Sequence, residues 1–328
     1  MFEFISRKII NIFAGKGHHS KLLVFSFHDV YESTSIFSKT SIKFEYFNKK
    51  IRWINRHFDI VPLSEGVELC RSGRLKRPTA CLTFDDGFAS HSELVLPLLL
   101  ELDIKASFFI SSEHLDENLL WNDALTVFYQ RSSRQQWIEI SNIIYALAKI
   151  KGDYNYFEVE QTLKYLTLKE RGGVIIKINQ MVDVGLDKKR MLSNEQIINL
   201  DKNGMECGAH TVHHPILTIE DIQTSTVEIV DDLIKLRNVL NKITKTFAYP
   251  NGKPKKDFNE HHLNVLANNR VKYAVTTSPG YFVAGSDPLQ IPRVSLIGKN
   301  SFQYLRCIVS NYNFLGDFVE CRGYEAKD

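Results

Sequence analysis

Cysteine is scarce in this chain, and the cysteines are scattered. The 328 residues include five Cys, an odd number, and no two of them form a C-x-x-C pair. A disulfide framework uses an even set of cysteines, and thiolate zinc sites use closely spaced pairs. The spacing therefore argues against both. We expect Cys81 and Cys207, which lie in apolar runs, to pack as small core side chains.

Long apolar runs and a large charge excess are also missing. The best apolar run covers only residues 94–100, whereas a helix that crosses a bilayer needs about 20 apolar residues. Lys plus Arg number 41 against 38 Asp plus Glu, a net charge of +3. This small excess gives no reason to expect a nucleic-acid partner, which requires a concentrated basic face. With 44% hydrophobic and 24% charged residues, the composition is that of a globular protein.

The first residues do not have the pattern of a signal peptide, because they are too polar and lack a small-residue cleavage site. As a helix, this segment would place its large apolar residues on one face: Phe2, Ile5, Ile9, Ile12 and Phe13. Such a stripe predicts either a helix packed on the body of the protein or contact with a membrane surface. We expect a cytoplasmic protein, with peripheral contact at the inner membrane face through residues 1–16 as the alternative. Oligomeric state is not indicated.

Most of the chain alternates between apolar runs and helical patterns, which is typical of parallel α/β architecture. Helices are predicted at 41–57, 92–102, 193–204 and 220–240. Ser193 is predicted as the N-cap of its helix, and Gly204 as the residue just beyond its end. Buried strands are predicted within the following runs: 21–30, 78–87, 105–111, 205–211, 244–252, 271–277 and 289–296.

Between about residues 115 and 190 this alternation stops and the pattern is mostly helical. Helices are predicted at 121–129, 136–148 and 158–166, with no strong strand before the apolar run at 172–178. We interpret the stretch as a helical insertion. Trp121, at its start, is expected to belong to its core, with a ligand contact as the alternative. The predicted organisation is an amphipathic segment, 1–17, followed by one interrupted domain, 18–328.

Unusual polar residues follow four of the predicted strands. The carboxyl ends of parallel strands meet at one edge of a sheet, where α/β proteins place their active sites. We therefore expect one convergent site. It is built from these segments: His28-Asp29, Asp85-Asp86, His210 to His214, and Tyr249-Pro250-Asn251.

Two of these segments have the residue types of a metal site. The carboxylates of Asp85 and Asp86 would repel each other unless a cation or hydrogen bonds hold them. The side chains of adjacent residues point in different directions, so one carboxylate can bind a metal while the other faces the metal-bound water. A simple Asp-Asp-Gly turn is the alternative. His210 and His214 can meet on one face, and two imidazoles with one carboxylate form an open catalytic metal site. A His-rich loop without metal is the alternative there, and His213 should face elsewhere.

Together the motifs resemble those of the polysaccharide deacetylase family, also called the NodB-homology or carbohydrate esterase family 4 proteins. Residues 83–87 match its T-F-D-D-G motif, and residues 208–217 match its G-x-H-[ST]-x-x-H-P-x-L motif. Weaker matches lie at 247–252, 291–293 and 27–30. The resemblance spans roughly residues 21–297, apart from the insertion.

The resemblance implies a fold and a mechanism. The implied fold is an α/β, distorted (β/α) barrel, and the implied cofactor is a divalent metal, usually zinc, for hydrolysis of N-acetyl or O-acetyl groups on sugars. By position, the metal ligands would be Asp86, His210 and His214. Asp85 would be the general base. A backbone N–H near Asn251 would stabilise the oxyanion.

The chain departs from the best-known family pattern at two places. Ala248 stands where most members carry the arginine that orients the base; Arg293 is the expected substitute, with a surface ion pair as the alternative. No His follows His262, so the C-terminal L-x-H motif that supplies the acid in many members is missing. A subgroup resembling the poly-N-acetylglucosamine deacetylases takes its acid from the first strand, and His28 fits that order. A structural His at the strand end is the alternative.

The leading hypothesis is a metal-dependent N-deacetylase that acts on an N-acetylated sugar or polysaccharide. One alternative keeps the enzyme class but changes the bond, as in a deformylase or another amide hydrolase acting on a lipid-linked amino sugar. A second alternative is a glycan-binding protein that keeps the fold without catalysis; the complete set of predicted base and ligands argues against it. The sequence identifies neither the sugar nor the metal.

Overall fold

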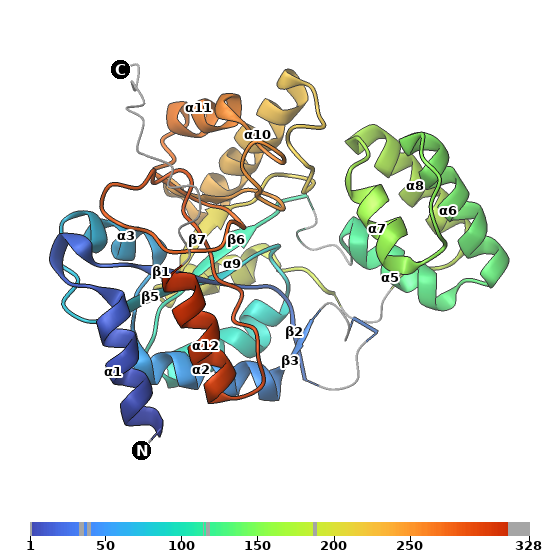
Figure 1. Ribbon diagram of the computed structural model, residues 1–328. Helices are drawn as coiled ribbons and strands as arrows, with labels where there is room; N and C mark the ends of the chain where they lie inside the picture. The colour runs from blue at the N-terminus through green and yellow to red at the C-terminus, as the bar shows by residue number, and fades with distance from the viewer. Residues whose placement is uncertain are drawn as a thin grey trace.

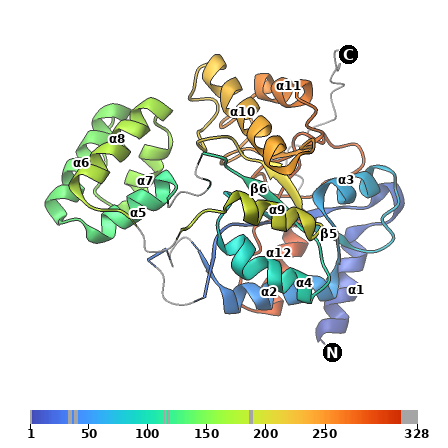
Figure 2. The same cartoon turned by 180° about the vertical axis from the view of Figure 1, so that it is seen from behind.

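The computed structural model describes residues 2–32, 36–37, 41–113, 115, 119–185 and 189–313. At its centre lies a parallel sheet, curled into a half-barrel with helices around it (Figures 1 and 2). Within the described residues the strand order is β1-β5-β6-β7-β8-β9, and β4 pairs with the start of β5. The predicted α/β barrel fold is confirmed. The strands are β1 (Leu23–Phe27), β4 (Asp59–Ile60), β5 (Thr79–Phe84), β6 (Ser107–Ile110), β7 (Glu206–Ala209), β8 (Thr246–Ala248) and β9 (Tyr273–Val275).

The predicted last strand, 289–296, is not a regular strand, but it joins the two edges of the sheet. Ile291 pairs with Val275 of β9, and Val294 pairs with Phe25 of β1. Pro292 lies between these two bridges and has no N–H to donate, which prevents a continuous ladder. The segment nevertheless holds Arg293 between the first and last strands.

Helices cover the outside of the sheet. Ser193 accepts a hydrogen bond from the N–H of Gln196 and caps α9, and Gly204 follows the end of that helix with a φ of +79°; both predictions are confirmed. Two short strands, β2 (Val30–Tyr31) and β3 (Ile42–Lys43), form a separate pair beside β1. The helices of the barrel part are α2 (Phe44–His57), α3 (Leu63–Arg71), α4 (Leu96–Glu101), α9 (Asn194–Lys202), α10 (Ile222–Leu240), α11 (Glu260–Asn268) and α12 (Ser301–Tyr312).

Four helices of the described chain form a lobe beside the half-barrel (Figures 1 and 2). They are α5 (Trp121–Arg131), α6 (Arg134–Ala148), α7 (Tyr156–Lys164) and α8 (Leu168–Met181). The apolar run at 172–178, which left room for a strand, is part of α8: a capping box of Thr167 and Glu170 starts the helix, and Val174 and Ile178 are buried one turn apart. The lobe has its own apolar cluster, which includes the buried Trp121, as predicted.

The N-terminal helix α1 (Phe2–Ala14) is amphipathic, as predicted, but the face that it buries is not the predicted stripe. Its buried residues are Ser6, Ile10 and Ala14, whereas Ile9 and Phe13 are half-buried and the other members of the stripe are exposed. Ile10 is fully buried, and the Ser6 hydroxyl lies 2.7 Å from Nε2 of His57 on α2. Phe4 is 62% exposed and Ile12 is 77% exposed. The helix is thus held on the body by one side and leaves large apolar side chains on the surface. Among the described helices, none has the length and apolarity of a membrane span.

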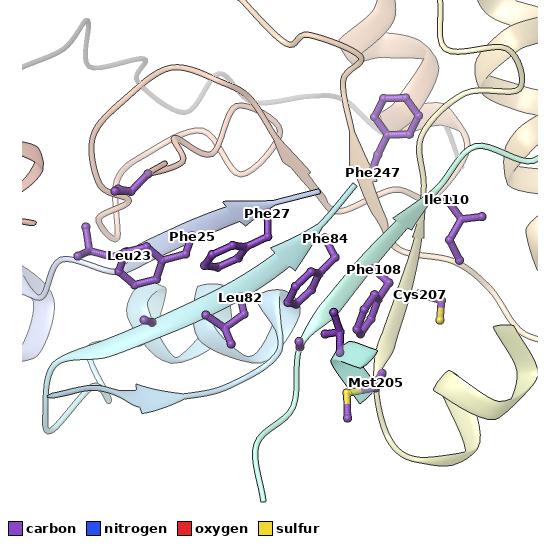
Figure 3. Close-up of a cluster of buried hydrophobic side chains, with 14 of the residues drawn as sticks. Leu23, Phe25, Phe27, Leu82, Phe84, Phe108, Ile110, Met205, Cys207 and Phe247 are labelled. Carbon is purple, nitrogen blue, oxygen red and sulfur yellow. The ribbon is translucent and has the colours of Figure 1, made fainter. Parts of the chain in front are cut away.

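A row of aromatic rings on β1, β5 and β6 supports the carboxyl edge of the sheet (Figure 3). Phe84 stacks on Phe27 and on Phe108, with ring centroids 5.5 and 4.9 Å apart. Cys81 and Cys207 are buried in the core, as predicted. Because Phe84 immediately precedes Asp85, this packing fixes the point at which the polar residues begin.

His91 joins this aromatic cluster. It opens a short π-helical turn that leads into α4, in place of the regular helix start predicted at residue 92. Its ring is completely buried, with centroids 5.6 Å from that of Phe84 and 5.5 Å from that of Phe108. Its Nε2 lies 3.2 Å from the carbonyl oxygen of His28, so Nε2–H donates to that oxygen. The ring therefore fixes the backbone at the end of β1.

Acidification should weaken the fold through His91. Burial lowers the pKa of His91 to about 4 from 6.5. Between the two pKa values the imidazole is protonated in the unfolded chain but neutral in the folded chain. The free energy of unfolding is therefore highest above the unfolded pKa and decreases as pH falls toward the folded pKa. We expect the wild type to lose roughly 2 kcal/mol more than His91→Gln between pH 7 and pH 5. Urea unfolding at both pH values measures this; equal losses would contradict it.

Candidate metal and catalytic site

Asp86, His210 and His214 lie together at the carboxyl edge of the sheet, where a metal ion can be bound. One ligand atom from each lies within 4.8 Å of the others. Nε2 of His210 is 3.4 Å and Nε2 of His214 is 3.5 Å from Oδ1 of Asp86. Two ligands at about 2.0–2.1 Å from a tetrahedral ion are themselves roughly 3.3 Å apart. The three residues therefore fit a divalent metal, with room for further ligands.

The ligand-bearing turns use unusual backbone conformations. Asp86 has a φ of +77°, Thr211 of +68° and His214 of +54°. These are left-handed conformations that L-residues rarely adopt, and they persist only when surrounding contacts hold them. The contacts described below must therefore hold both turns.

Electrostatics keeps the triad in forms suited to binding a cation. Burial alone would raise the pKa of Asp86, but the contact with His210 and the nearby imidazoles outweigh it and lower that pKa. Burial lowers the pKa of His214 to about 3, so its ring is neutral. Burial also disfavours charge on His210, but the contact with Asp86, the charge of Asp85 and the hydrogen bond to Ala248 together outweigh burial and raise the pKa of His210. A cation at the triad would compete with that proton.

Hydrogen bonds orient His210. Its Nδ1 lies 2.7 Å from the carbonyl oxygen of Ala248, so Nδ1–H donates and Nε2 keeps its lone pair for a metal. The N–H of His210 donates to Oδ2 of Asp232, and that of Ser112 donates to Oδ1. Burial raises the pKa of Asp232 to about 6 despite these bonds. Asp232 thus links the loops that follow β6 and β7.

The turn that carries His214 is held from two sides. From α10, Glu228 accepts the N–H of His213 at 2.8 Å and lies 2.6 Å from its Nδ1, so His213 faces away from the triad, as predicted. From the helical lobe, Arg171 donates to the carbonyl oxygens of His213 at 2.7 Å and of His214 at 3.2 Å. Arg171 is buried and stacks over Trp121. The lobe therefore contacts the ligand turn directly.

Asp85 forms a buried ion pair with Arg293. Nη1 of Arg293 lies 2.7 Å from Oδ1 of Asp85, and Nε donates to the carbonyl oxygen of Thr276 at 2.8 Å. Both side chains are buried, with Arg293 only 3% exposed, so this is not the surface pair considered as the alternative. Burial alone would raise the pKa of Asp85, but the charge and hydrogen bond of Arg293, together with the nearby imidazoles of His210 and His28, outweigh burial and lower that pKa. Asp85 is therefore an anion at neutral pH.

His28 lies at the mouth of the site. Its side chain is 52% exposed, and Nε2 is 3.8 Å from Oδ2 of Asp85. The neighbouring Asp29 has other partners: it accepts hydrogen bonds from Ser41 and Ser90 and pairs with Arg190 at 3.0 Å. The imidazole of His28 thus faces Asp85 and solvent.

Arg190 ties the end of β1 to the helical lobe. Besides Asp29 it contacts Asp123 of α5 at 2.6 Å, and its guanidinium stacks on Phe37 and Phe88. Burial raises the pKa of Asp123 to about 6, although Arg190 opposes the shift. A second arginine, which is 11% exposed, therefore joins the lobe to a catalytic loop.

Asn251 follows β8 at the same edge. Its φ is +57°, and its carbonyl oxygen accepts a hydrogen bond from the hydroxyl of Thr277. Among the described residues, neither its backbone N–H nor its buried Nδ2 has an acceptor. The turn after β8 therefore has hydrogen-bond donors without a protein partner at the edge of the sheet that carries the triad.

The structure thus brings six of the predicted site residues together, places Asn251 after a neighbouring strand at the same edge, and adds several residues that sequence analysis did not find. The six are His28, Asp85, Asp86, His210, His214 and Arg293. Asp232 had one available signal: it is a buried acid on the face of α10 that also buries Ile229, Leu233 and Leu236. The others gave no local signal, because their partners are distant in sequence. They are His91, Arg171, Arg190 and Glu228.

Comparison with known proteins identifies the family. The polysaccharide deacetylase family model matches residues 72–274, which is more than half of the chain. The chain therefore belongs to the polysaccharide deacetylase family, and the predicted enzyme class, a carbohydrate deacetylase, is confirmed. No curated protein matches the chain.

Solved structures share the fold at low sequence identity. The deacetylase PplD of Streptococcus pyogenes in complex with acetate is 16% identical, with a TM-score of 0.58 over 89% of this chain and 98% of that chain. IcaB from Ammonifex degensii is 16% identical, with a TM-score of 0.60 over 90% and 97%. A de-N-acetylase from Aggregatibacter actinomycetemcomitans is 13% identical, with a TM-score of 0.56 over 88% and 100%.

Removing the guanidinium of Arg171 should weaken metal binding without touching a ligand. Arg171→Gln removes the hydrogen bonds to the carbonyls of His213 and His214, so the strained turn loses its support. Substitution of a residue that holds a metal ligand in place typically lowers metal affinity by about 10–100-fold. Competition with a chelator for Zn²⁺ measures the affinity. Arg131→Gln is the matched control, because Arg131 is exposed on α5 and donates to the carbonyls of Asp183 and Gly185. Wild-type affinity in Arg171→Gln would contradict this role.

Proposed function

We propose that this protein is a metal-dependent hydrolase that removes N-acetyl groups from an N-acetylated sugar or polysaccharide. The observation that carries the proposal is the buried Asp85–Arg293 pair beside the triad of Asp86, His210 and His214. A carboxylate held as an anion next to three convergent metal ligands suits base-assisted attack of water on an amide.

The triad would hold a divalent metal such as zinc, which when bound polarises the acyl carbonyl and makes water a better nucleophile. Asp85 takes the proton of the attacking water. Arg293 keeps the carboxylate of Asp85 ionised and oriented, the role that the arginine missing at Ala248 has in most family members. Because Arg293 is also bonded to Thr276 and Thr83, the carboxylate cannot turn away.

His28 and Asn251 complete the proposed reaction. The departing amine needs a proton, and the half-exposed imidazole of His28 lies on the open side of Asp85, where a sugar can reach both groups. The N–H of Asn251 would donate to the developing oxyanion. The base is thus buried and the acid is open to substrate.

Metal content and acetate release test this assignment together. We expect stoichiometric metal in wild type and in Asp85→Asn, and acetate from N-acetylglucosamine oligomers with wild type only, the rate falling by roughly 10²–10⁴ because the general base is lost. The control is Asp59→Asn, because Asp59 is an exposed acid in β4, outside the site.

Other outcomes point to the alternatives. Metal without acetate in wild type would move the substrate to formylated or lipid-linked amino sugars, which a substrate panel then identifies. Failure to bind zinc would contradict the proposal and favour a glycan-binding protein without catalysis. Thermal unfolding of Asp85→Asn checks that the unpaired Arg293 has not disrupted the fold.

We also infer that the protein is cytoplasmic and that α1 contacts the inner face of a membrane. Ile10 anchors the helix on the body, while Phe4, Ile5 and Ile12 remain exposed next to the basic Arg7 and Lys8. Exposed apolar residues beside basic ones suit the headgroup region of an anionic bilayer.

Vesicle binding tests this contact. Replacing Phe4, Ile5 and Ile12 by Ser should reduce partitioning into anionic vesicles by about tenfold or more, because each buried apolar side chain contributes to membrane affinity. Deletion of residues 1–16 should have the same effect. Phe157→Ser, which removes an exposed aromatic ring from the lobe, should bind like wild type. Unchanged partitioning after the triple substitution or the deletion would contradict the membrane contact.

A further inference from the structure

A polar cavity adjoins the proposed acid, His28. Its volume is about 440 Å³, within the range of small-molecule sites. The end of β1, the β2–β3 pair, the first half of α2 and residues 295–296 form its walls. None of the three metal-triad residues is part of the lining. The cavity therefore extends the site on the side of His28, beyond the atoms that react.

Two lysines give this cavity its charge. Lys43 and Lys50 both line it. Within the described residues neither has a carboxylate at ion-pair distance, although the charge of the exposed Lys43 acts on the nearby Glu45. Lys50 is partly buried, and its Nζ donates to the carbonyl oxygen of Leu296 at 2.7 Å. Burial lowers the pKa of Lys50, because its ammonium has lost water without gaining an anion. An anion in the cavity would compensate for that loss.

The one acidic residue in the lining is already neutralised. The carboxylate of Asp29 is buried, pairs with Arg190 at 3.0 Å and accepts hydrogen bonds from Ser41 and Ser90. By contrast with Lys43 and Lys50, Lys49 forms an ion pair with Glu45 at 2.6 Å and does not line the cavity. The uncompensated charge in the lining is therefore positive.

Hydroxyl groups add neutral donors to the same walls. Tyr31, Tyr46 and Ser295 line the cavity together with the two lysines. Ammonium groups combined with hydroxyl donors are the usual partners of carboxylate and phosphate oxygens. An uncharged glycan would not need two unpaired cations in this position.

We propose that this cavity is a subsite for an anionic group of the substrate, a carboxylate or a phosphate, carried on the sugar next to the one that loses its acetyl group. This inference rests on the proposed function, because it identifies the substrate as an acidic glycan. It makes Lys43 and Lys50 determinants of specificity, with no part in the chemical step.

Direct binding tests the subsite without relying on activity. The intact protein is titrated calorimetrically with inorganic phosphate and with glucuronate at constant ionic strength. We expect at least one of them to bind, and to bind at least tenfold more weakly to the double variant Lys43→Gln/Lys50→Gln. Lys49→Gln should bind like wild type. Phosphate alone or glucuronate alone as ligand identifies the source of the anion; no binding, or equal binding by the double variant, overturns the proposal.

Kinetics with matched substrates provides the second test. Two N-acetylglucosamine trisaccharides are compared, one with a glucuronate neighbour and one with a glucose neighbour. We expect the glucuronate substrate to have about tenfold higher kcat/KM than the glucose substrate in wild type. The double variant should lose this preference because its KM for the glucuronate substrate rises, and Lys50→Arg should retain it. Equal preference in wild type and double variant would overturn the subsite. Acetate release from neither substrate would count against the proposed function, while the titration still decides the subsite.

Discussion

The buried ion pair between Asp85 and Arg293 is the interaction on which the rest of the site depends. A buried charge is costly unless a partner and hydrogen bonds compensate for it, and here each residue compensates for the other. Arg293 also belongs to the segment that bridges β9 and β1. The contact that ionises the proposed base therefore also joins the edges of the half-barrel, so fold and chemistry are stabilised by the same residue.

The helical lobe is part of this arrangement. Arg171 of α8 holds the turn of His213 and His214, and Arg190, where the chain returns from the lobe, holds Asp29 beside His28. The left-handed backbone at His214 needs such support. A lobe that served only as a spacer would not contribute Arg171 to one catalytic loop and, through the Asp123–Arg190 pair, contact a second one.

Short sequence patterns predicted the site residues whose positions depend on the strand that they follow. The apolar runs of β1, β5 and β7 and the polar residues at their ends located His28, Asp85 and His210, because strand ends meet at one edge. The run at 172–178 could not be assigned within the helical insertion, since an apolar run that short does not distinguish a strand from one face of a helix. Arg171 could not be predicted, because its partners are backbone carbonyls far away in the sequence, and the only signal for Asp232 was its position on the apolar face of α10.

The positive charges around the site divide into two kinds, and only one kind is available to a substrate. Arg293 is paired with Asp85, Arg190 with Asp29 and Asp123, and Arg171 with backbone carbonyls. Arg293 and Arg171 are buried and Arg190 is largely so, and the three set the geometry. Lys43 and Lys50 lie outside this set, in a cavity where neither forms an ion pair with a carboxylate of the described residues. Because the three arginines have partners and these two lysines have no ion pair, the charge that selects a substrate lies beside His28, on the side of the site away from the metal triad.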